Sequence, residues 1–402
     1  MKNSIDTFAK KTLFSQLKKI KHGKLNIVEG RKKYTFGHSK DIIANIHVKN
    51  PLFYRHVLFG GSIGSSESYI QGYWDSSDLT KVIEIMAINE QTMDKMEGWF
   101  KLLVRPIFKI MHYLNKNTLE GSKKNIAQHY DLSNDFFSLF LDPTMMYSSG
   151  IYKSRSMSLE SASLNKLDII CRKLHLKRSD KIIEIGSGWG GFAIYAANKY
   201  GCHVTTTTIS KQQFQYVKSK IKKLKLEKKV TVLFKDYRDL SGSYDKLVSI
   251  EMIEAVGHQY YDSYFQVISN LLKEDGEALI QAITIRDQRY KQAIKSIDFI
   301  QKYIFPGSCI PSLTAIQNSL TDSTDMVINQ VDDIGHHYAI TLRQWRKNFN
   351  ANINEIYKLG FDKSFSRMWI FYLCYCEGGF MEKAISDLHI HITKPRYRNI
   401  IK

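Results

Sequence analysis

Hydrophobic and polar positions follow a regular pattern from about residue 160 onward, where short apolar runs alternate with segments of helical periodicity. The apolar runs predict strands at residues 181–185, 203–209, 229–234, 244–250 and 276–285. The segments of helical periodicity predict helices at residues 164–174, 192–200, 211–224 and 260–272. Because strands that alternate with helices form a mainly parallel sheet with helices on both faces, the pattern predicts an α/β fold.

The first 120 residues have a shorter and more mixed pattern. Residues 25–37 predict two short strands around a glycine turn, and residues 65–90 predict a helix, an aromatic turn and a second helix. The loop sequence GSKKN then marks a change in pattern. We therefore expect a smaller, mainly helical N-terminal domain over residues 1–122 and a second domain over residues 123–402.

Two segments predict helices with one apolar side and one side rich in lysine. Residues 6–22 form either a helix that docks on anionic lipid headgroups or an ordinary packed helix with a solvated lysine face. In the second segment, Phe214, Val217, Ile221 and Leu224 share one face. We expect that face to pack against the sheet and the neighbouring lysines to point toward anionic headgroups.

The composition adds a constraint on partners and on compartment. A net charge of +19 and a pI near 9.4 predict an anionic partner, which could be nucleic acid, a phospholipid surface or an acidic protein. Five cysteines without a C-x-x-C pair favour free thiols in the cytoplasm. The longest apolar run, at residues 368–376, is too short to span a bilayer, so we expect any membrane contact to be peripheral, at the inner face.

The sequence EIGSGWGGFA, which follows the first predicted strand of the α/β region, carries the clearest chemical signal. Its glycines predict a tight turn that lets the backbone approach a nucleotide-like ligand, with a helix N-terminus behind it. A nicotinamide dinucleotide site requires an acid about 20 residues further on, where this chain has TTTTIS. Glu184, two residues before the first glycine, instead suits the class I S-adenosylmethionine-dependent methyltransferase fold.

A series of motifs in order resembles the cyclopropane-fatty-acyl-phospholipid synthase and mycolic acid cyclopropane synthase family. The motifs are QHYDLSNDFFSLFLDPTMMYSSGIY, EIGSGWGGFA, TTTISKQQ, KDYRDL, SIEMIEAVGHQYYDSYF, DFIQKYIFPGSCIPS and HHYAITLRQWRKNF, which span residues 128–349. The segment SESYIQGYWDSSDL also resembles the extra helical domain of the longer, phospholipid-acting members. The resemblance therefore covers most of the chain.

The resemblance implies a reaction and a set of cofactor contacts. Members of this family transfer the methyl group of S-adenosylmethionine to a cis double bond in an acyl chain, and the resulting carbocation loses a proton from the new methyl group to close a cyclopropane ring. An aromatic face from Tyr130 is implied for the cation. The implied cofactor-binding residues are Tyr147, Ser148, Glu184, Gly186, Gly188, Gly190, Thr208, Gln213, Asp236 and Tyr237.

The family's base is understood to be a bound bicarbonate, held by a cysteine, a glutamate, a histidine, a tyrosine and a backbone group. In this sequence Glu254 and Tyr338 match the glutamate and the tyrosine, and Ile283 matches the backbone position. Ser149 and Gln281 stand in place of the cysteine and the histidine. Both can donate hydrogen bonds to an anion, but glutamine cannot titrate as histidine does. A fatty-acyl methyltransferase that forms a methyl or methylene branch is therefore the nearest alternative.

Other functions remain open from the sequence. An RNA methyltransferase would also suit a basic chain, but the sequence has no stacking aromatics with basic neighbours and no recognisable RNA module. A non-catalytic scaffold at the membrane surface is a further alternative. His336 and His337 have no other ligand at metal-binding spacing, so we expect no metal. By family analogy, we expect a homodimer.

Overall fold

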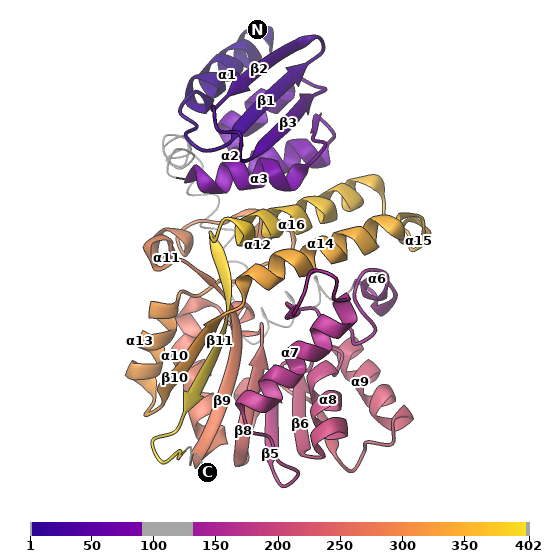
Figure 1. Ribbon diagram of the computed structural model, residues 1–402, viewed down its shortest axis with the longest axis vertical. Helices are drawn as coiled ribbons and strands as arrows, with labels where there is room; N and C mark the ends of the chain where they lie inside the picture. Colours follow the sequence, from indigo (N-terminus) through magenta and orange to yellow (C-terminus); the bar gives the residue numbers. More distant parts are fainter. Residues whose placement is uncertain (1, 91–131, 399–402) are drawn as a thin grey trace. The chain divides into compact units, whose positions relative to one another are not determined.

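The computed structural model describes residues 2–90 and 132–398, and Figure 1 shows its elements. The chain forms two compact units whose segments interleave along the sequence. The first unit comprises the described parts of Met1–Leu114 with Lys295–Ile304 and Trp345–Ala384. The second comprises the described parts of Asn115–Ile294 with Phe305–Gln344 and Ile385–Lys402. The boundary that we predict at residue 122 lies outside the described residues, so it stays a prediction.

The first unit contains a four-stranded sheet in the order β2-β1-β3-β4. Its strands are β1 (Lys24–Glu29), β2 (Lys32–Phe36), β3 (Ile43–Val48) and β4 (Trp74–Asp75). Its helices are α1 (Lys2–Leu17), α2 (Leu52–Ile70), α3 (Leu79–Ile88), α12 (Phe299–Tyr303), α15 (Ile353–Lys358) and α16 (Lys363–Met381). The predicted hairpin is confirmed by the antiparallel pairing of β1 with β2, while β3, which runs parallel to β1, has no counterpart in the predictions.

Helix α1 packs on its own unit. Leu13 and Leu17 are buried, and the amino group of Lys10 binds the Glu29 carboxylate beneath the helix. Phe8, in contrast, remains exposed. Of the two alternatives for this helix, the contacts favour the one in which the apolar side serves packing.

The second unit is built on a seven-stranded sheet in the order β10-β11-β9-β8-β5-β6-β7. Its strands are β5 (Lys181–Ile185), β6 (His203–Thr208), β7 (Val230–Phe234), β8 (Tyr244–Ile250), β9 (Leu272–Ile285), β10 (Val327–Asp333) and β11 (Ile385–Thr393). Strands β5 to β9 are mutually parallel, whereas β11 runs antiparallel between β9 and β10. The parallel α/β sheet predicted from the sequence is confirmed, and β10 and β11 extend it.

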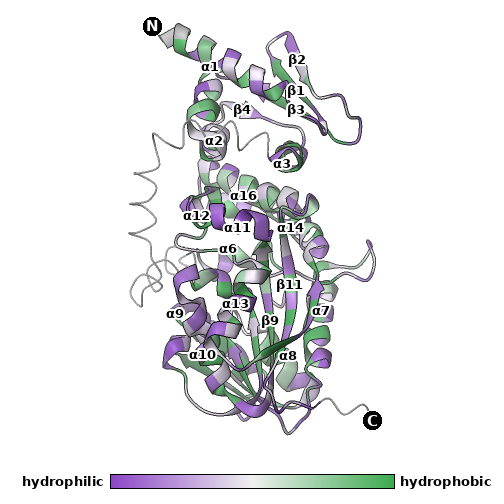
Figure 2. Ribbon diagram, turned by 90° about the vertical axis from the view of Figure 1, so that its left-hand side faces the viewer, coloured by the Kyte–Doolittle hydropathy of each residue, from purple (hydrophilic) through white to green (hydrophobic). Residues whose placement is uncertain are grey.

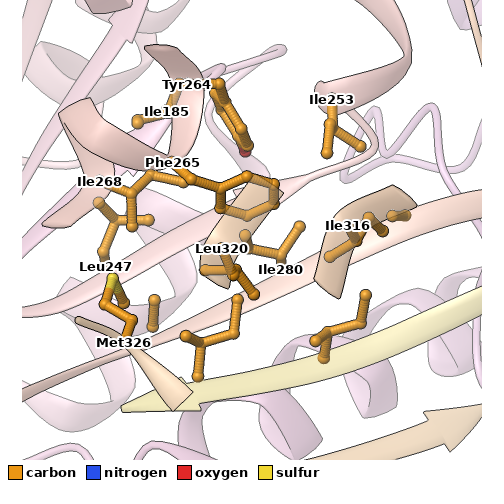
Figure 3. Close-up of a cluster of buried hydrophobic side chains, with 14 of the residues drawn as sticks. Ile185, Leu247, Ile253, Tyr264, Phe265, Ile268, Ile280, Ile316, Leu320 and Met326 are labelled. Carbon is orange, nitrogen blue, oxygen red and sulfur yellow. The ribbon is translucent and has the colours of Figure 1, made fainter. Parts of the chain in front are cut away.

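Helices cover both faces of this sheet. The helices of this unit are α6 (Asn134–Ser138), α7 (Leu159–Lys173), α8 (Gly191–Tyr200), α9 (Lys211–Lys223), α10 (Tyr261–Leu271), α11 (Asp287–Ala293), α13 (Leu313–Ser323) and α14 (Gly335–Ala351). Helix α14 belongs to this unit up to Gln344, and its remaining residues belong to the first unit. Helices α7, α8 and α9 pack on one face, and α10 and α13 pack on the other. Figure 3 shows side chains of α10 and α13 meeting those of β5, β8 and β9.

Helix α9 corrects one detail of the predicted apolar face. Val217 and Ile221 are buried against the sheet, and the Phe214 ring contacts the Phe234 ring with centroids 5.6 Å apart. Leu224, however, is 48% exposed, because the helix ends at Lys223 and the chain turns away there. The rest of α9 is mostly hydrophilic, as its purple colour in Figure 2 shows.

The face of the sheet that α7 covers is unusually polar along β9 and β11. On β11, the apolar residues Leu388, Ile390 and Ile392 point toward α10 and α13. The alternate residues on the opposite face are Asp387, His389 and His391, and all three are buried. A buried polar layer therefore lies beside the carboxyl ends of the parallel strands, where ligands bind in open α/β sheets.

Candidate functional site

The glycine loop between β5 and α8 has the geometry of a close-approach turn. Gly186, Gly188 and Gly190 have φ angles of 93°, 48° and 82°, in the left-handed region that favours glycine. The N–H groups of Gly186 and Ser187 donate to the Thr207 carbonyl at 3.2 and 2.7 Å, which ties the loop to β6. A Cβ added at Gly188 would meet no atom within 4 Å, so the backbone there faces open space.

Four of the implied cofactor-binding residues follow the next two strands of the sheet. Thr208 ends β6, and its hydroxyl donates to Gln213 Oε1 over 2.8 Å. Asp236 follows β7 and forms a bidentate ion pair with Arg238, with both N–O distances at 2.8 Å. The Tyr237 ring packs against Tyr264 with centroids 5.6 Å apart. These four predicted residues therefore lie at or shortly after the carboxyl ends of β6 and β7, at the same edge of the sheet as the glycine loop.

The segment before α7 lies against the beginning of α8. A side chain at Gly191 would clash with the Met146 sulfur, which shows how closely the Met146 side chain packs on the backbone of α8. The next residue, Tyr147, places its ring 5.2 Å from Phe137, centroid to centroid, and the Ser148 hydroxyl accepts a hydrogen bond from the buried Lys166 amino group. Tyr130, the predicted aromatic partner of the cation, lies outside the described residues.

Glu184 lies inside the sheet and is 2% exposed. Within the described ranges, no group donates a hydrogen bond to its Oε2 atom. Burial raises the pKa of this carboxyl to about 8, although Lys166 opposes the shift. A buried carboxylate oxygen without a donor is well suited to a positively charged group of a ligand.

The residues predicted to hold the base are brought together, but in an unexpected arrangement. Glu254 accepts a hydrogen bond from the Ile283 N–H through Oε1. Ser149 donates its hydroxyl hydrogen to the Gly150 carbonyl over 2.9 Å, while its backbone N–H donates to Glu251 Oε1 over 2.9 Å. Ser149 therefore binds a carboxylate of the chain itself through its backbone.

Glu251 is the centre of this arrangement, and sequence analysis missed it. The Tyr338 hydroxyl donates to Glu251 Oε2 over 2.6 Å, and Gln281 Nε2 donates to Glu251 Oε1 over 2.7 Å. With the Ser149 N–H, three donors from distant parts of the sequence converge on one carboxylate. No local sequence pattern could have revealed these contacts, because the donors are far from Glu251 along the chain. Within the same motif, it is Glu254 and not Glu251 that matches the family's glutamate.

Asp387 and His389 complete the contacts of Gln281. Nε2 of Gln281 donates to Asp387 Oδ2 over 2.7 Å, and Gln281 Oε1 lies 3.3 Å from His389 Nε2. The orientation of the amide follows from these partners, because its oxygen could not face two carboxylates. Both residues belong to β11, whose alternation of polar and apolar positions was the available signal in the sequence.

The titratable side chains of the site are mostly acidic. Four carboxyl groups belong to it, those of Glu184, Glu251, Glu254 and Asp387, beside the buried Lys166. Burial, with the charge of Glu251, raises the pKa of Glu254 to about 8. Burial lowers the pKa of Lys166 to about 8, against the pull of the surrounding carboxylates. An added cation would favour the ionised forms of these carboxyl groups, whereas an added anion would disfavour them.

Comparisons with known proteins are consistent with this geometry. The sequence model of the family described as mycolic acid cyclopropane synthetase matches residues 117–390. The chain belongs to this family. Within the family, it is 35% identical over 328 residues to tuberculostearic acid methyltransferase UfaA1 of Mycobacterium tuberculosis. The aligned residues cover 80% of this chain and 76% of the relative.

A second relative covers more of the chain. Cyclopropane-fatty-acyl-phospholipid synthase of Escherichia coli K12 is 35% identical over 350 residues, 85% of this chain and 86% of its own. Among solved structures, the mycolic acid cyclopropane synthase CmaA1 complexed with SAH and CTAB matches with a TM-score of 0.64 and 29% identity, covering 68% of this chain and 98% of the other.

Together these matches confirm the predicted family, the class I methyltransferase fold and S-adenosylmethionine as the methyl donor. The chain is thus a lipid-modifying enzyme of the S-adenosylmethionine-dependent class. The buried Oε2 of Glu184 and the open backbone at Gly188 fit that cofactor. In the described ranges, no helix combines the length and the apolar character that crossing a bilayer requires.

Proposed function

We propose that the protein methylates the cis double bond of an acyl chain in a membrane phospholipid and closes a cyclopropane ring. The observation that carries this proposal is the group of buried carboxylates at the carboxyl ends of β5 and β8. Next to a positive charge such buried acids favour their ionised forms and stabilise that charge in a water-poor site, which a reaction through a carbocation requires. The match to the phospholipid synthase of E. coli, over most of both chains, supports phospholipid as the substrate class.

Two groups of residues would serve the reaction, one that binds the methyl donor and one that stabilises the carbocation. When bound, S-adenosylmethionine supplies an electrophilic methyl group on a sulfonium centre. The glycine loop and Glu184 would hold the donor, through backbone contact and through charge. The rings of Phe137, Tyr147 and Trp189 pack together beside the glycine loop, and the partly exposed ring of Tyr147 would offer an electron-rich face to a cation.

A branched product is the second candidate. It is favoured by the match to tuberculostearic acid methyltransferase UfaA1, which is a methyltransferase by name and is as similar in identity as the cyclopropane synthase. The two outcomes differ in where the positive charge lies when the new methyl group loses a proton. Loss while the charge is on the neighbouring carbon closes a ring, whereas a 1,2-hydride shift that first moves the charge to the methyl-bearing carbon leads to a methylene branch.

Lipid mass analysis tests the proposed function. The protein is expressed in a bacterial host that lacks its own cyclopropane synthase and is fed methionine labelled in the methyl group. We expect labelled phospholipid acyl chains that gain one CH2 and resist ozonolysis, because a ring leaves no double bond. A labelled chain that ozone cleaves would support the branched product, and label that is absent from every lipid would refute both.

We further propose that the protein acts peripherally at the inner face of the membrane, with anionic headgroups favoured. The net charge of +19 supports this, as do the exposed lysines along α9, in the unit that carries the site. A homodimer remains a prediction by family analogy.

A further inference from the structure

Glu251 occupies the position that a bound anion would need. Its carboxylate accepts hydrogen bonds from the Ser149 N–H, Gln281 Nε2 and the Tyr338 hydroxyl, at 2.9, 2.7 and 2.6 Å. Ser149, Gln281 and Tyr338 match three of the five positions at which the family's pattern places the ligands of bicarbonate. In this chain their donors are directed at a carboxylate that is covalently part of the protein.

The backbone conformation of Glu251 is unfavourable for a residue with a side chain, which indicates that the carboxylate has a function at this position. Its φ angle is 48°, in the left-handed region, where a residue with a side chain costs about 1–2 kcal/mol more than glycine does. The residue directly follows β8, and its N–H donates to the Gln281 carbonyl over 2.8 Å, so the conformation is fixed by the sheet. Glycine would suit this backbone better, yet the chain carries glutamate.

The surroundings do not fit an additional bicarbonate. Ser149 directs its hydroxyl to Gly150, and Gln281 uses Nε2 for Glu251 and Asp387. Oε2 of Glu254 and Oδ1 of Asp387 are buried without a donor among the described residues. A further anion would therefore lie beside the Glu251 carboxylate and two more acidic side chains, with the hydrogen-bond donors already engaged.

We propose that Glu251 is the general base of the reaction and takes the place of bicarbonate. This inference rests on the proposed function. After methyl transfer to one carbon of the double bond, the carbocation on the other carbon has a methyl neighbour. The Glu251 carboxylate accepts a proton from that methyl group, and the electron pair of the broken C–H bond forms the C–C bond that closes the ring. Glu251 becomes a neutral carboxylic acid and later releases its proton to water.

Glu251 suits this role better than the neighbouring carboxylates. Burial raises the pKa of Glu251 as well, but Lys166, the Tyr338 hydroxyl and the Ser149 N–H oppose that shift, and three donors stabilise the ionised form. Asp387 is fully buried, and burial together with the charge of Glu251 raises its pKa well above the usual range. The carboxyl of Glu254 faces the Ile283 N–H and its own backbone N–H, and burial with the charge of Glu251 raises its pKa to about 8, so it is mostly protonated at neutral pH.

Two substitutions of Glu251, assayed in the full chain, test the proposal. Glu251→Gln keeps the shape and can still accept from the Ser149 N–H, but an amide is not a base. We expect turnover on phospholipid vesicles to fall by about a hundredfold or more, with affinity for S-adenosylhomocysteine nearly unchanged. The same exchange at the surface, Glu274→Gln, should leave turnover unchanged, because that side chain is 76% exposed.

Glu251→Gly supplies the complementary test. Glycine relieves the backbone at φ 48° and leaves the three donors facing a space of carboxylate size. We expect this variant to be inactive in buffer depleted of carbon dioxide and to regain activity when bicarbonate or formate is added. The wild-type enzyme should show no dependence on bicarbonate.

Binding of ¹³C-bicarbonate, followed by NMR, separates this inference from the proposed function because it needs no lipid. We expect saturable binding to Glu251→Gly and none to the wild-type protein. Saturable binding to the wild type, or full turnover by Glu251→Gln, would overturn the inference even if phospholipid is the substrate. A wild type that labels no lipid would overturn the proposed function, and the base with it.

Discussion

Burial decides the charge of individual side chains in this site, and Glu184 is the clearest case. The sequence predicted that Glu184 binds the cofactor, but it did not predict the charge state of this side chain. The structure shows a side chain that is 2% exposed with a pKa raised by burial to about 8. At neutral pH the free protein therefore holds Glu184 mostly protonated, and a bound cation should change that.

The affinity for the cofactor product should consequently depend on pH. The amino group of S-adenosylhomocysteine is positively charged and favours ionised Glu184, so binding below about pH 8 should release a proton. Affinity should rise with pH from about pH 5 and level off near pH 8. Calorimetric titration in buffers of different ionisation enthalpy measures the proton release.

Matched substitutions show whether Glu184 is responsible. Glu184→Gln should weaken binding and remove most of the pH dependence. The control substitution Asp180→Asn should leave the pH dependence of binding intact. Asp180 is also buried with a raised pKa, but it lies just before the first residue of β5, at the end of the strand away from the glycine loop. Equal proton release by the wild type and Glu184→Gln would contradict the prediction.

At the same scale, sequence reasoning reached Glu254 but not Glu251. Glu254 lies in a motif that matches the family residue by residue. The importance of Glu251 comes from donors at Ser149, Gln281 and Tyr338, which are far apart in sequence and meet only in the folded sheet. Sequence patterns report on neighbours along the chain, so contacts of this kind have no local signal.

Among the elements, the predicted strands and helices of the α/β region were found because each carries a clear periodicity. Strand β11 was not predicted, because the polar residues on one of its faces are typical of a segment exposed to solvent. In the structure that face is covered by α7, with Lys173 of α7 3.2 Å from His389. Burial of polar groups against other polar groups breaks the simple rule that polar positions face water.

The glycine loop allows a prediction about one element with an internal control. Gly188 and Gly30 have φ angles of 48° and 56°, and a Cβ at either position would meet no atom within 4 Å. Alanine should therefore destabilise the fold by a similar 1–2 kcal/mol at each position. Only Gly188→Ala should also weaken binding of S-adenosylhomocysteine, by about tenfold or more.

Thermal unfolding and calorimetric titration measure these two effects separately. Similar losses of stability combined with a loss of affinity at Gly188 alone would agree with direct backbone contact. Normal affinity of Gly188→Ala would show that the cofactor does not approach this part of the loop.

For the molecule as a whole, the net charge of +19 predicts salt-sensitive binding to anionic vesicles. On α9 and just after it, Lys222, Lys223 and Lys225 are exposed. Replacing all three by glutamine should weaken vesicle binding by about fivefold per lysine, which corresponds to about 1 kcal/mol each. Co-sedimentation at several salt concentrations measures the effect.

A control with the same loss of charge is available in the other unit. Arg31, Lys32 and Lys33 are exposed around the β1–β2 turn. Their replacement by glutamine should weaken binding less than the α9 variant does. Equal losses would mean that overall charge, and not α9, governs the attraction, and insensitivity to salt and to anionic lipid would contradict membrane docking altogether.

The position of β11 has a consequence for how the enzyme matures during translation. Six strands of the larger sheet leave the ribosome before residues 385–393, yet β11 lies between β9 and β10 and must enter last. Until then β9 presents an unpaired edge, which is a site for misassociation between nascent chains. Gln281 also lacks Asp387 during this interval. Chaperone demand and the onset of catalysis should therefore both be set by the synthesis of this one late segment.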